Sequence, residues 1–327
     1  MRKMTFILSL TALFYACKEN KSYQYLPESI GQVQSILVVM EDSLWQGAVG
    51  DSVRKIFLSP LKGLSVAESS NQIQHIPPSV FKGTVKQNRT VLVVGIDSIA
   101  LAHIKKDVYS RPQRVGVVKG RNEAEIISQF QSKATAFVKS FKDLEITQAQ
   151  ERFSRSLNQE KGVENLLGIR VSIPSAYRLG KQTESFVWLD RAIPAGSTNI
   201  IAYSLKGDSF EHPESFVADI VAKRDSVLKG NIPGPDIPGK TTYMKTETVF
   251  MPYVTPVSFG GYKGVEVRGI WEISGYPMAG PFVSYILNDP KQNRKIVIEG
   301  FVFAPNKEKR DYLFELEAII KTIKPVL

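Results

Sequence analysis

The stretch NEAEIISQFQSKATAFVKSFKDLEITQAQERFSRSL, residues 122–157, decides how the rest of the chain is divided. Asn122 followed by Glu125 resembles a capping box, which marks the start of a helix. Apolar residues then recur at three- and four-residue steps, the spacing of one helix face: Ile127, Phe130, Ala134, Phe137, Phe141, Leu144 and, less regularly, Ala149, Phe153 and Leu157. We predict a long linking helix within residues 122–160, bent near 142–147. It either packs across both halves of the protein, which we favour, or binds a partner.

Residues 31–121, before this helix, have the pattern of a small α/β unit. Compact β-branched runs predict buried strands at 33–40, 72–76, 90–96 and 114–118. Helical spacing of apolar residues predicts helices at 47–58 and 98–107. The resulting order, βαββαβ, is that of a ferredoxin-like unit.

Residues 161–327, after the helix, are rich in strand signals. Segments with strand composition lie at 169–173, 185–189, 199–204, 242–249, 264–273, 281–287 and 294–304. A helix is predicted near 213–228, and a final amphipathic helix is predicted to begin at Asn306 and to stop at Pro325. An antiparallel sheet backed by helices fits this half, so the expected fold class of the chain is α+β.

The N-terminus has the three parts of a lipoprotein signal peptide in residues 1–16. Arg2 and Lys3 precede thirteen mostly apolar residues, too few to span a bilayer that needs about 20. Small Ala16 stands before Cys17, the one cysteine of the sequence. We predict cleavage, lipidation of Cys17 and attachment to the cell envelope, with the outer membrane as the expected site. An ordinary cleaved signal and an uncleaved anchor are the alternatives.

Residues 17–30 are expected to form a polar tether between the lipid and the fold. Lys18, Glu19 and Asn20 resemble a signal that sends some lipoproteins of Bacteroidota to the cell surface, and we leave open whether the protein faces the surface or the periplasm. Without residues 1–16 the chain keeps 40 basic and 32 acidic residues, scattered rather than clustered. A nucleic-acid partner is not expected, because such binding needs a dense basic patch.

Several motifs of the sequence do not predict a cofactor, a metal or a nucleophile. With Cys17 acylated, no thiol remains for a disulfide or a metal, and His75, His103 and His212 lack metal-ligand spacing. GPDIPGKT, residues 234–241, matches a phosphate-loop pattern, but its two inner prolines remove N–H donors that such a loop needs. No G-x-S-x-G elbow of a serine hydrolase occurs. We therefore expect no cofactor, no metal and no recognisable nucleophile.

Carboxylates in the C-terminal half leave one catalytic hypothesis open. Glu266, Arg268 and Glu272 alternate along a predicted strand, opposite Val265, Val267 and Trp271, and Glu299 could join their face. Two carboxylates with an arginine could supply acid–base chemistry for glycan cleavage. A solvated sheet surface or a lattice of salt bridges is the structural alternative.

Aromatic residues near glycine-rich turns suggest recognition more than chemistry. GGYKG at 260–264 and GYPMAGPF at 275–282 place Tyr262, Tyr276 and Phe282 in predicted turns, and Trp45 lies in the turn 43–50. These four residues are candidates for contact with a protein or glycan partner of the envelope. Aromatic residues in turns also commonly pack into the hydrophobic core, which is the structural alternative.

Three stretches carry a resemblance to a known family: residues 26–57, residues 231–247 with NIPGP and YMKTE, and residues 267–322 with WE, GPF, GFVFAP and KRD. They are similar to an uncharacterised lipoprotein family of Bacteroidota, a domain of unknown function. The resemblance covers nearly the whole mature chain. It implies an exported lipoprotein, and it supplies no activity, cofactor or catalytic residue.

The expected function is therefore that of a membrane-anchored envelope lipoprotein, non-enzymatic, that binds or scaffolds a partner. A cryptic envelope hydrolase acting through the carboxylates of the C-terminal sheet is the alternative.

Overall fold

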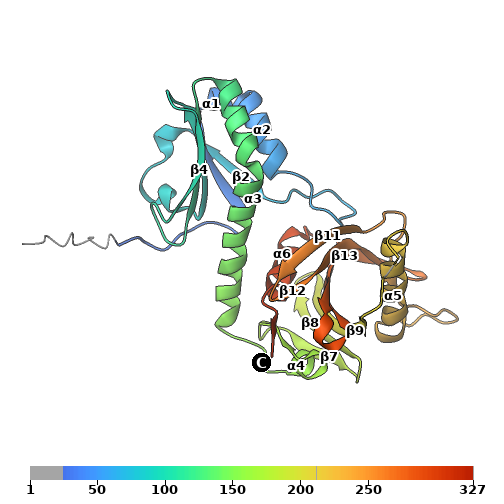
Figure 1. The fold of residues 1–327 in the computed structure, drawn as a ribbon. Helices are drawn as coiled ribbons and strands as arrows, with labels where there is room; N and C mark the ends of the chain where they lie inside the picture. Colours follow the sequence, from blue (N-terminus) through green and yellow to red (C-terminus); the bar gives the residue numbers. More distant parts are fainter. Residues whose placement is uncertain (1–24, 211, 327) are drawn as a thin grey trace, which may run out of the picture.

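The computed structural model describes residues 25–210 and 212–326. They form two large β-sheets, one in each half of the chain, joined by a single long helix (Figure 1), and a separate two-stranded pair. The N-terminal sheet is mostly parallel with helices on one face, and the C-terminal sheet is antiparallel, curled and backed by helices. The α+β class, the long linking helix and the antiparallel C-terminal sheet are confirmed. The leader, residues 1–16, and the predicted lipidation site Cys17 lie outside the described residues.

The N-terminal sheet has five strands in the order β2-β1-β3-β5-β4. Its strands are β1 (Ser35–Val39), β2 (Gln72–Ile76), β3 (Thr90–Ile96), β4 (Leu101–Lys106) and β5 (Arg114–Gly120). Two helices, α1 (Asp42–Gln46) and α2 (Ala48–Phe57), connect β1 to β2, and two short 3₁₀ turns, η1 (Pro78–Val80) and η2 (Gly83–Gln87), precede β3. All pairs are parallel except β4 with β5.

The ferredoxin-like order predicted for this half is wrong. The segment 98–107, predicted as its second helix, contains strand β4, which forms an antiparallel edge beside β5. Ala102 and Ile104 pack against the core under the helices, so the two-residue period of a strand prevails over the weak helical spacing. The sheet therefore gains a fifth strand and stays parallel through its centre.

Strand β1 is buried on both faces, which explains its continuous apolar run. Ile36, Val38 and Met40 point toward α2 and the long helix. Leu37 and Val39 belong to a second cluster on the other face. That second face is covered by apolar side chains of the connecting segments, including Phe81, Val85 and Tyr109.

The linking helix α3 runs without interruption from Glu123 to Ser154. The Asn122 side chain accepts a hydrogen bond from the Glu125 backbone N–H at 3.0 Å, as the capping pattern predicts. Phe130, Phe137 and Phe141 in its first part pack in the N-terminal core. Ile146, Ala149 and Phe153 in its last part pack in the C-terminal core. The helix therefore shares its apolar face between both halves.

The C-terminal sheet has eight strands, with β10-β12-β13-β14-β9-β8-β7 in line and β11 paired to β12. Its strands are β7 (Arg178–Gln182), β8 (Phe186–Ile193), β9 (Gly196–Lys206), β10 (Met244–Thr246), β11 (Tyr253–Phe259), β12 (Tyr262–Ile273), β13 (Tyr276–Asp289) and β14 (Arg294–Phe303). A separate pair joins β6 (Ile169–Arg170) to β15 (Lys324–Pro325). The remaining elements are α4 (Gly162–Leu167), α5 (Phe216–Asn231), η3 (Pro290–Gln292) and α6 (Arg310–Ile320).

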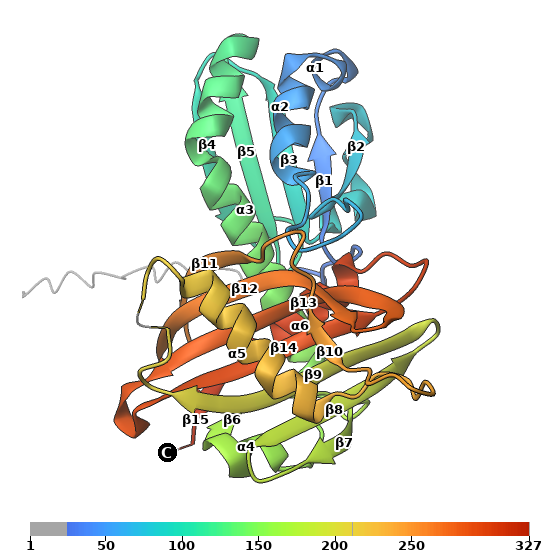
Figure 2. The ribbon, with the colours of Figure 1, turned by 90° about the vertical axis from the view of Figure 1, so that its right-hand side faces the viewer.

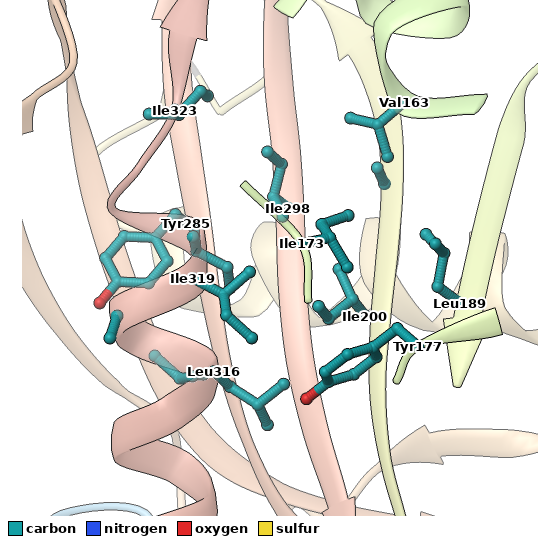
Figure 3. Packing of buried hydrophobic residues seen from close by; sticks show 14 of the residues in the cluster. Val163, Ile173, Tyr177, Leu189, Ile200, Tyr285, Ile298, Leu316, Ile319 and Ile323 are labelled. Carbon is teal, nitrogen blue, oxygen red and sulfur yellow. The ribbon is translucent and has the colours of Figure 1, made fainter. Parts of the chain in front are cut away.

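Each face of this sheet has its own core. Helices α4 and α6 and the end of α3 cover one face, where Tyr177, Tyr285, Leu316 and Ile319 pack together (Figure 3). Helix α5 lies across the other face (Figure 2) and covers a cluster around Trp271. The sheet is therefore a buried layer between two helical layers.

The end of the predicted tether is part of the fold. The backbone N–H of Ile30 donates a hydrogen bond to the Gln87 carbonyl at 2.9 Å, and the backbone N–H of Arg111 donates to the Pro27 carbonyl at 2.8 Å. These bonds hold residues 27–30 against the N-terminal half. The expected tether 17–30 therefore includes residues that belong to the fold, and its residues 17–24 lie outside the described chain.

Candidate functional site

A cavity of about 170 Å³ lies where the N-terminal half, α3 and the C-terminal half meet. An engineered cavity of roughly 150 Å³ holds benzene, so a small organic molecule fits this space. Its apolar wall consists of Ile36, Phe57, Leu61, Val138, Phe141 and Phe314. Its polar wall consists of Gln34, Ser59, Ser70, Asn71, Thr90, Lys142, Glu145, Arg268, Arg310 and Glu317.

Helical spacing places the charged groups of the wall side by side. Arg310, Phe314 and Glu317 stand at positions i, i+4 and i+7 of α6, which is one face of a helix. Val138, Lys142 and Glu145 follow the same spacing on α3. The loop between α2 and β2 supplies Ser59, Ser70 and Asn71 from the N-terminal half. The cavity therefore forms only where both halves come together.

Glu317 is the centre of the charge network beside the cavity. Its carboxylate accepts from Lys142 Nζ at 2.7 Å, Lys321 Nζ at 2.6 Å and Arg268 Nη2 at 2.7 Å. The side chain of Glu317 is 3 % exposed. Burial by itself raises the pKa of Glu317, but the charges of Lys142, Arg268 and Lys321 outweigh it and hold the pKa well below the usual value. Glu317 is therefore an ionised structural centre.

Glu266 and Arg268, neighbours on one face of β12, extend this network. Arg268 Nε donates to Glu266 Oε1 at 2.6 Å, and the buried hydroxyl of Tyr285 donates to Glu266 Oε2 at 2.6 Å. Burial raises the pKa of Glu266, but the charge and hydrogen bond of Arg268, together with the hydrogen bond of Tyr285, outweigh it and hold the pKa below the usual value. The pKa of Tyr285 is raised by burial and by the charges of Glu317 and Glu266.

A second pair closes the cavity on the side of the N-terminal sheet. Arg89 donates to both oxygens of Glu145, at 2.7 Å from Nε and 3.1 Å from Nη2. Gln34, which has a φ of 54°, donates its backbone N–H to the same carboxylate at 3.4 Å. Both acids that line the cavity thus have cationic partners.

Helix α6 begins at Arg310 rather than at Asn306, the predicted cap. Asn306 adopts a φ of 59° in the preceding turn. The carboxylate of Glu68, from the loop of the N-terminal half, accepts from the backbone N–H groups of Lys309 and Arg310, each at 2.8 Å. A side chain remote in sequence therefore caps this helix and ties the two halves together.

Two of the predicted carboxylates lie elsewhere. Glu299 is fully buried on the opposite face of the sheet, where it accepts from Arg224 at 2.6 Å and 2.9 Å. Glu272 pairs with Lys245 at 2.9 Å, directly across from it on β10. The prediction that Glu299 joins the face of Glu266 and Glu272 is wrong, because its register partner on β13 is Ser284, which in turn pairs with Val267.

The four candidate aromatic residues do not gather on one surface. Phe282 is 1 % exposed and packs under Arg224 in the core, so its prediction as a contact residue is wrong. Trp45 stacks on His75 at 4.7 Å in the N-terminal half. Tyr262 and Tyr276 lie near opposite ends of β12, roughly 35 Å apart along a strand of this length. Of the four, Tyr276 is an exposed large side chain.

Within the part of the chain that the structure describes, the phosphate-loop match and His75 have no functional neighbours that would support a phosphate or metal site. The segment 234–241 lies between α5 and β10, so the element that follows it in the described chain is a strand and not the helix that a phosphate loop requires. His75 bonds to the Met40 carbonyl at 2.9 Å. Among the described residues no group of three histidine, cysteine or acidic side chains is placed to hold a metal ion. No helix within residues 25–210 or 212–326 is long and apolar enough to cross a membrane.

Sequence reasoning missed Lys142, Arg310 and Glu317 as site residues. A signal was present, because charged residues stand on the apolar faces of two helices that pack together. Glu317 follows Leu313 and Phe314 and precedes Ile320 on the buried side of α6. A charge at such a position needs a buried partner, but the sequence does not say which residue provides it.

Two family models match the chain. The first, described as Domain of unknown function (DUF4837), matches residues 156–322. The second, described as Domain of unknown function (DUF8532), matches residues 29–154. The comparison with curated proteins gave no match.

The comparison with solved structures gave matches of low identity and low TM-score. LpqN of Mycobacterium tuberculosis, described as involved in cell envelope biogenesis, is 15 % identical to this chain, with a TM-score of 0.29. The match covers 48 % of this chain and 82 % of LpqN. The Ran-binding protein Mog1p of Saccharomyces cerevisiae is 8 % identical, with a TM-score of 0.29, 49 % of this chain and 90 % of that chain covered. A protein of unknown function from Pseudomonas aeruginosa, PA94, is 14 % identical to this chain, with a TM-score of 0.22. The match covers 41 % of this chain and 75 % of PA94.

Proposed function

The chain belongs to the DUF4837 family of domains of unknown function, and on that premise we propose that it is a lipid-anchored, non-enzymatic binding protein of the cell envelope whose ligand occupies the cavity between its two halves. The anchor is Cys17, and the family is the lipoprotein family of Bacteroidota that the sequence resembles. The membrane is reached through the N-terminal lipid, and the folded body stands on the tether that follows it.

The observation that carries the binding role is the composition of the cavity wall. The ligand space combines an apolar side with polar side chains from the loop 59–71, which is the make-up of a small-molecule site. Because α2, α3, β12 and α6 all contribute, a bound molecule contacts both halves at once. Binding there stabilises one arrangement of the halves, which is how a ligand would regulate a scaffold.

The charged groups favour binding over catalysis. A general acid must hold a proton near the working pH. Glu266 and Glu317 have lowered pKa values, and each is engaged by cations. Glu299 and Glu272 belong to separate ion pairs. The hydrolase alternative therefore has less support than a binding role.

The test is native mass spectrometry of the full-length chain, purified in mild detergent from the organism that makes it. We expect one small molecule per chain. A Val138→Phe variant places a ring in the cavity, and it should lose the bound mass while keeping its melting temperature within a few degrees. Val249→Phe, on an exposed side chain, is the matched control and should retain the ligand. An empty wild-type protein, or equal occupancy in both variants, would contradict the cavity as the binding site.

A further inference from the structure

Arg310 differs from the other buried arginines at this junction. It is 5 % exposed and lines the cavity. Its Nε donates to Asp311 at 2.8 Å, and within the described chain its two terminal nitrogens have no hydrogen-bond partner. By contrast, Arg268 binds two carboxylates and Arg89 binds both oxygens of one.

These terminal nitrogens are not sealed within the protein. Among the described residues, Ser29 Oγ is the one side-chain polar atom that is both fully buried and without a partner. The Arg310 terminal nitrogens also lack a partner, so they keep some accessible surface, and Arg310 lines the cavity. A guanidinium left in this setting retains up to four N–H donors for a ligand.

The charged groups around the cavity carry a net positive charge. Three cations line it, Lys142, Arg268 and Arg310, against two carboxylates, Glu145 and Glu317. Adding the direct ion-pair partners outside the wall gives two further cations, Arg89 and Lys321, and two further carboxylates, Glu266 and Asp311. Both counts leave one positive charge, which belongs to the network around Glu317, because Arg310 is paired with Asp311 and Arg89 with Glu145. One monoanion would neutralise it.

We propose that the cavity binds a small monocarboxylate with an apolar body, whose carboxylate is held by the two terminal nitrogens of Arg310. This inference rests on the proposed binding role of the cavity. The planar guanidinium matches a carboxylate with two parallel hydrogen bonds, and such bonds to a charged group are the strong ones. Glu145 and Glu317 do not serve as this partner, because their oxygens already bind Arg89, Lys142, Arg268 and Lys321.

The apolar part of the cavity wall can contact the apolar body of such a ligand. Phe57, Phe141 and Phe314 present apolar surface to the same space. Asn71, which lines the cavity, donates its amide Nδ2 to the Phe57 carbonyl at 3.0 Å, and its Oδ1 is an unused acceptor in the described chain. A volume of about 170 Å³ limits the body to about the size of one aromatic ring. The site therefore selects short ligands.

The experiment uses benzoate as the probe and benzamide as its neutral isostere, each titrated into the full-length protein and followed by heteronuclear NMR. Benzoate should bind at least about tenfold more tightly than benzamide, because it alone brings a charged partner to Arg310. Arg310→Gln should remove that preference, and Arg310→Lys should restore part of it. Arg178→Gln, at an exposed arginine without an ion pair in the described chain, is the control and should bind benzoate like the wild type.

The possible failures are separable. Equal binding of benzoate and benzamide to the wild type would overturn the monocarboxylate and leave the cavity as a binding site. Tighter binding of phenylphosphonate than of benzoate would also overturn it, in favour of a dianion. A neutral molecule found in the host-purified protein would overturn this inference while supporting the proposed function. An unaltered benzoate preference in Arg310→Gln would show that the carboxylate sits elsewhere.

Discussion

The Glu317 carboxylate on α6 forms a salt bridge of 2.7 Å with the Lys142 ammonium on α3. This salt bridge joins a helix of the C-terminal half to the helix that both halves share. Glu68, from the N-terminal half, reinforces the junction by capping the first turn of α6. The cavity lies among these contacts. Polar groups therefore hold the two halves together around the cavity.

Replacing Glu317 by glutamine should destabilise the protein by about 3–5 kcal/mol, because Lys142, Arg268 and Lys321 would lose their common partner in a buried site. The measurement is the free energy of unfolding from denaturant titration at pH 7. Glu308→Gln, on an exposed residue, is the matched control and should stay within about 0.5 kcal/mol of the wild type. Equal stability of the two variants would mean that the network contributes nothing.

Stability should fall in acid. The folded pKa values of Glu317 and Glu266 lie below the usual value, which is about 4.3 for an unfolded glutamate. The unfolded state therefore binds more protons between these values, so the stabilisation is complete above the unfolded pKa and is lost as the pH falls through the folded pKa. The free energy of unfolding should be level near neutral pH and decline below about pH 5. In Glu317→Gln this decline should be shallower, and an unchanged slope would refute the assignment.

Phe282→Ala and Tyr276→Ala should behave differently. Phe282 is buried beneath Arg224, in the core cluster under α5 that also contains Trp271, so truncation should cost about 3–5 kcal/mol. Tyr276 is 40 % exposed, and its truncation should stay within about 1 kcal/mol. Differential scanning calorimetry of both variants measures this. If Phe282→Ala melted like the wild type, its side chain would not be part of the core, and a role in partner contact would regain support.

Cys17→Ala should release the protein from the membrane. We expect the wild type in the membrane fraction, with an N-terminal peptide whose mass includes acyl chains, because stable anchoring takes more than one chain. The variant should appear in the soluble envelope fraction or stay uncleaved. Recovery of the variant in the membrane at the wild-type level, with no acyl mass on the wild type, would contradict lipid anchoring at this residue.

Local sequence patterns predict elements well where a single segment carries the signal. The run TVLVVGI at 90–96 becomes β3, and the 3.6-residue period after Asn122 becomes α3. The segment LAHIKK at 101–106 was wrongly assigned to a helix, because six residues carry too few turns to separate the two periods. The sheet order was also wrong for the N-terminal half, since strand pairing joins residues that the sequence does not mark as neighbours.

The site was less predictable than the fold for the same reason. Glu317 is the centre of the charge network because it forms salt bridges with Lys142 and Arg268, and these residues come from segments far apart in the chain. The alternation of Glu266 and Arg268 correctly placed both on one face of β12. It could not show that this face is buried beneath α6, or that Glu299 belongs to the other side of the sheet.

The most direct test of the central claim is a crystal structure of the protein purified from the organism that makes it. The account predicts density for a small molecule in the cavity, with a carboxylate about 2.8 Å from the terminal nitrogens of Arg310 and an apolar body beside Phe57 and Phe314. A cavity that holds water alone in such a preparation, with Arg310 turned toward solvent, would contradict it.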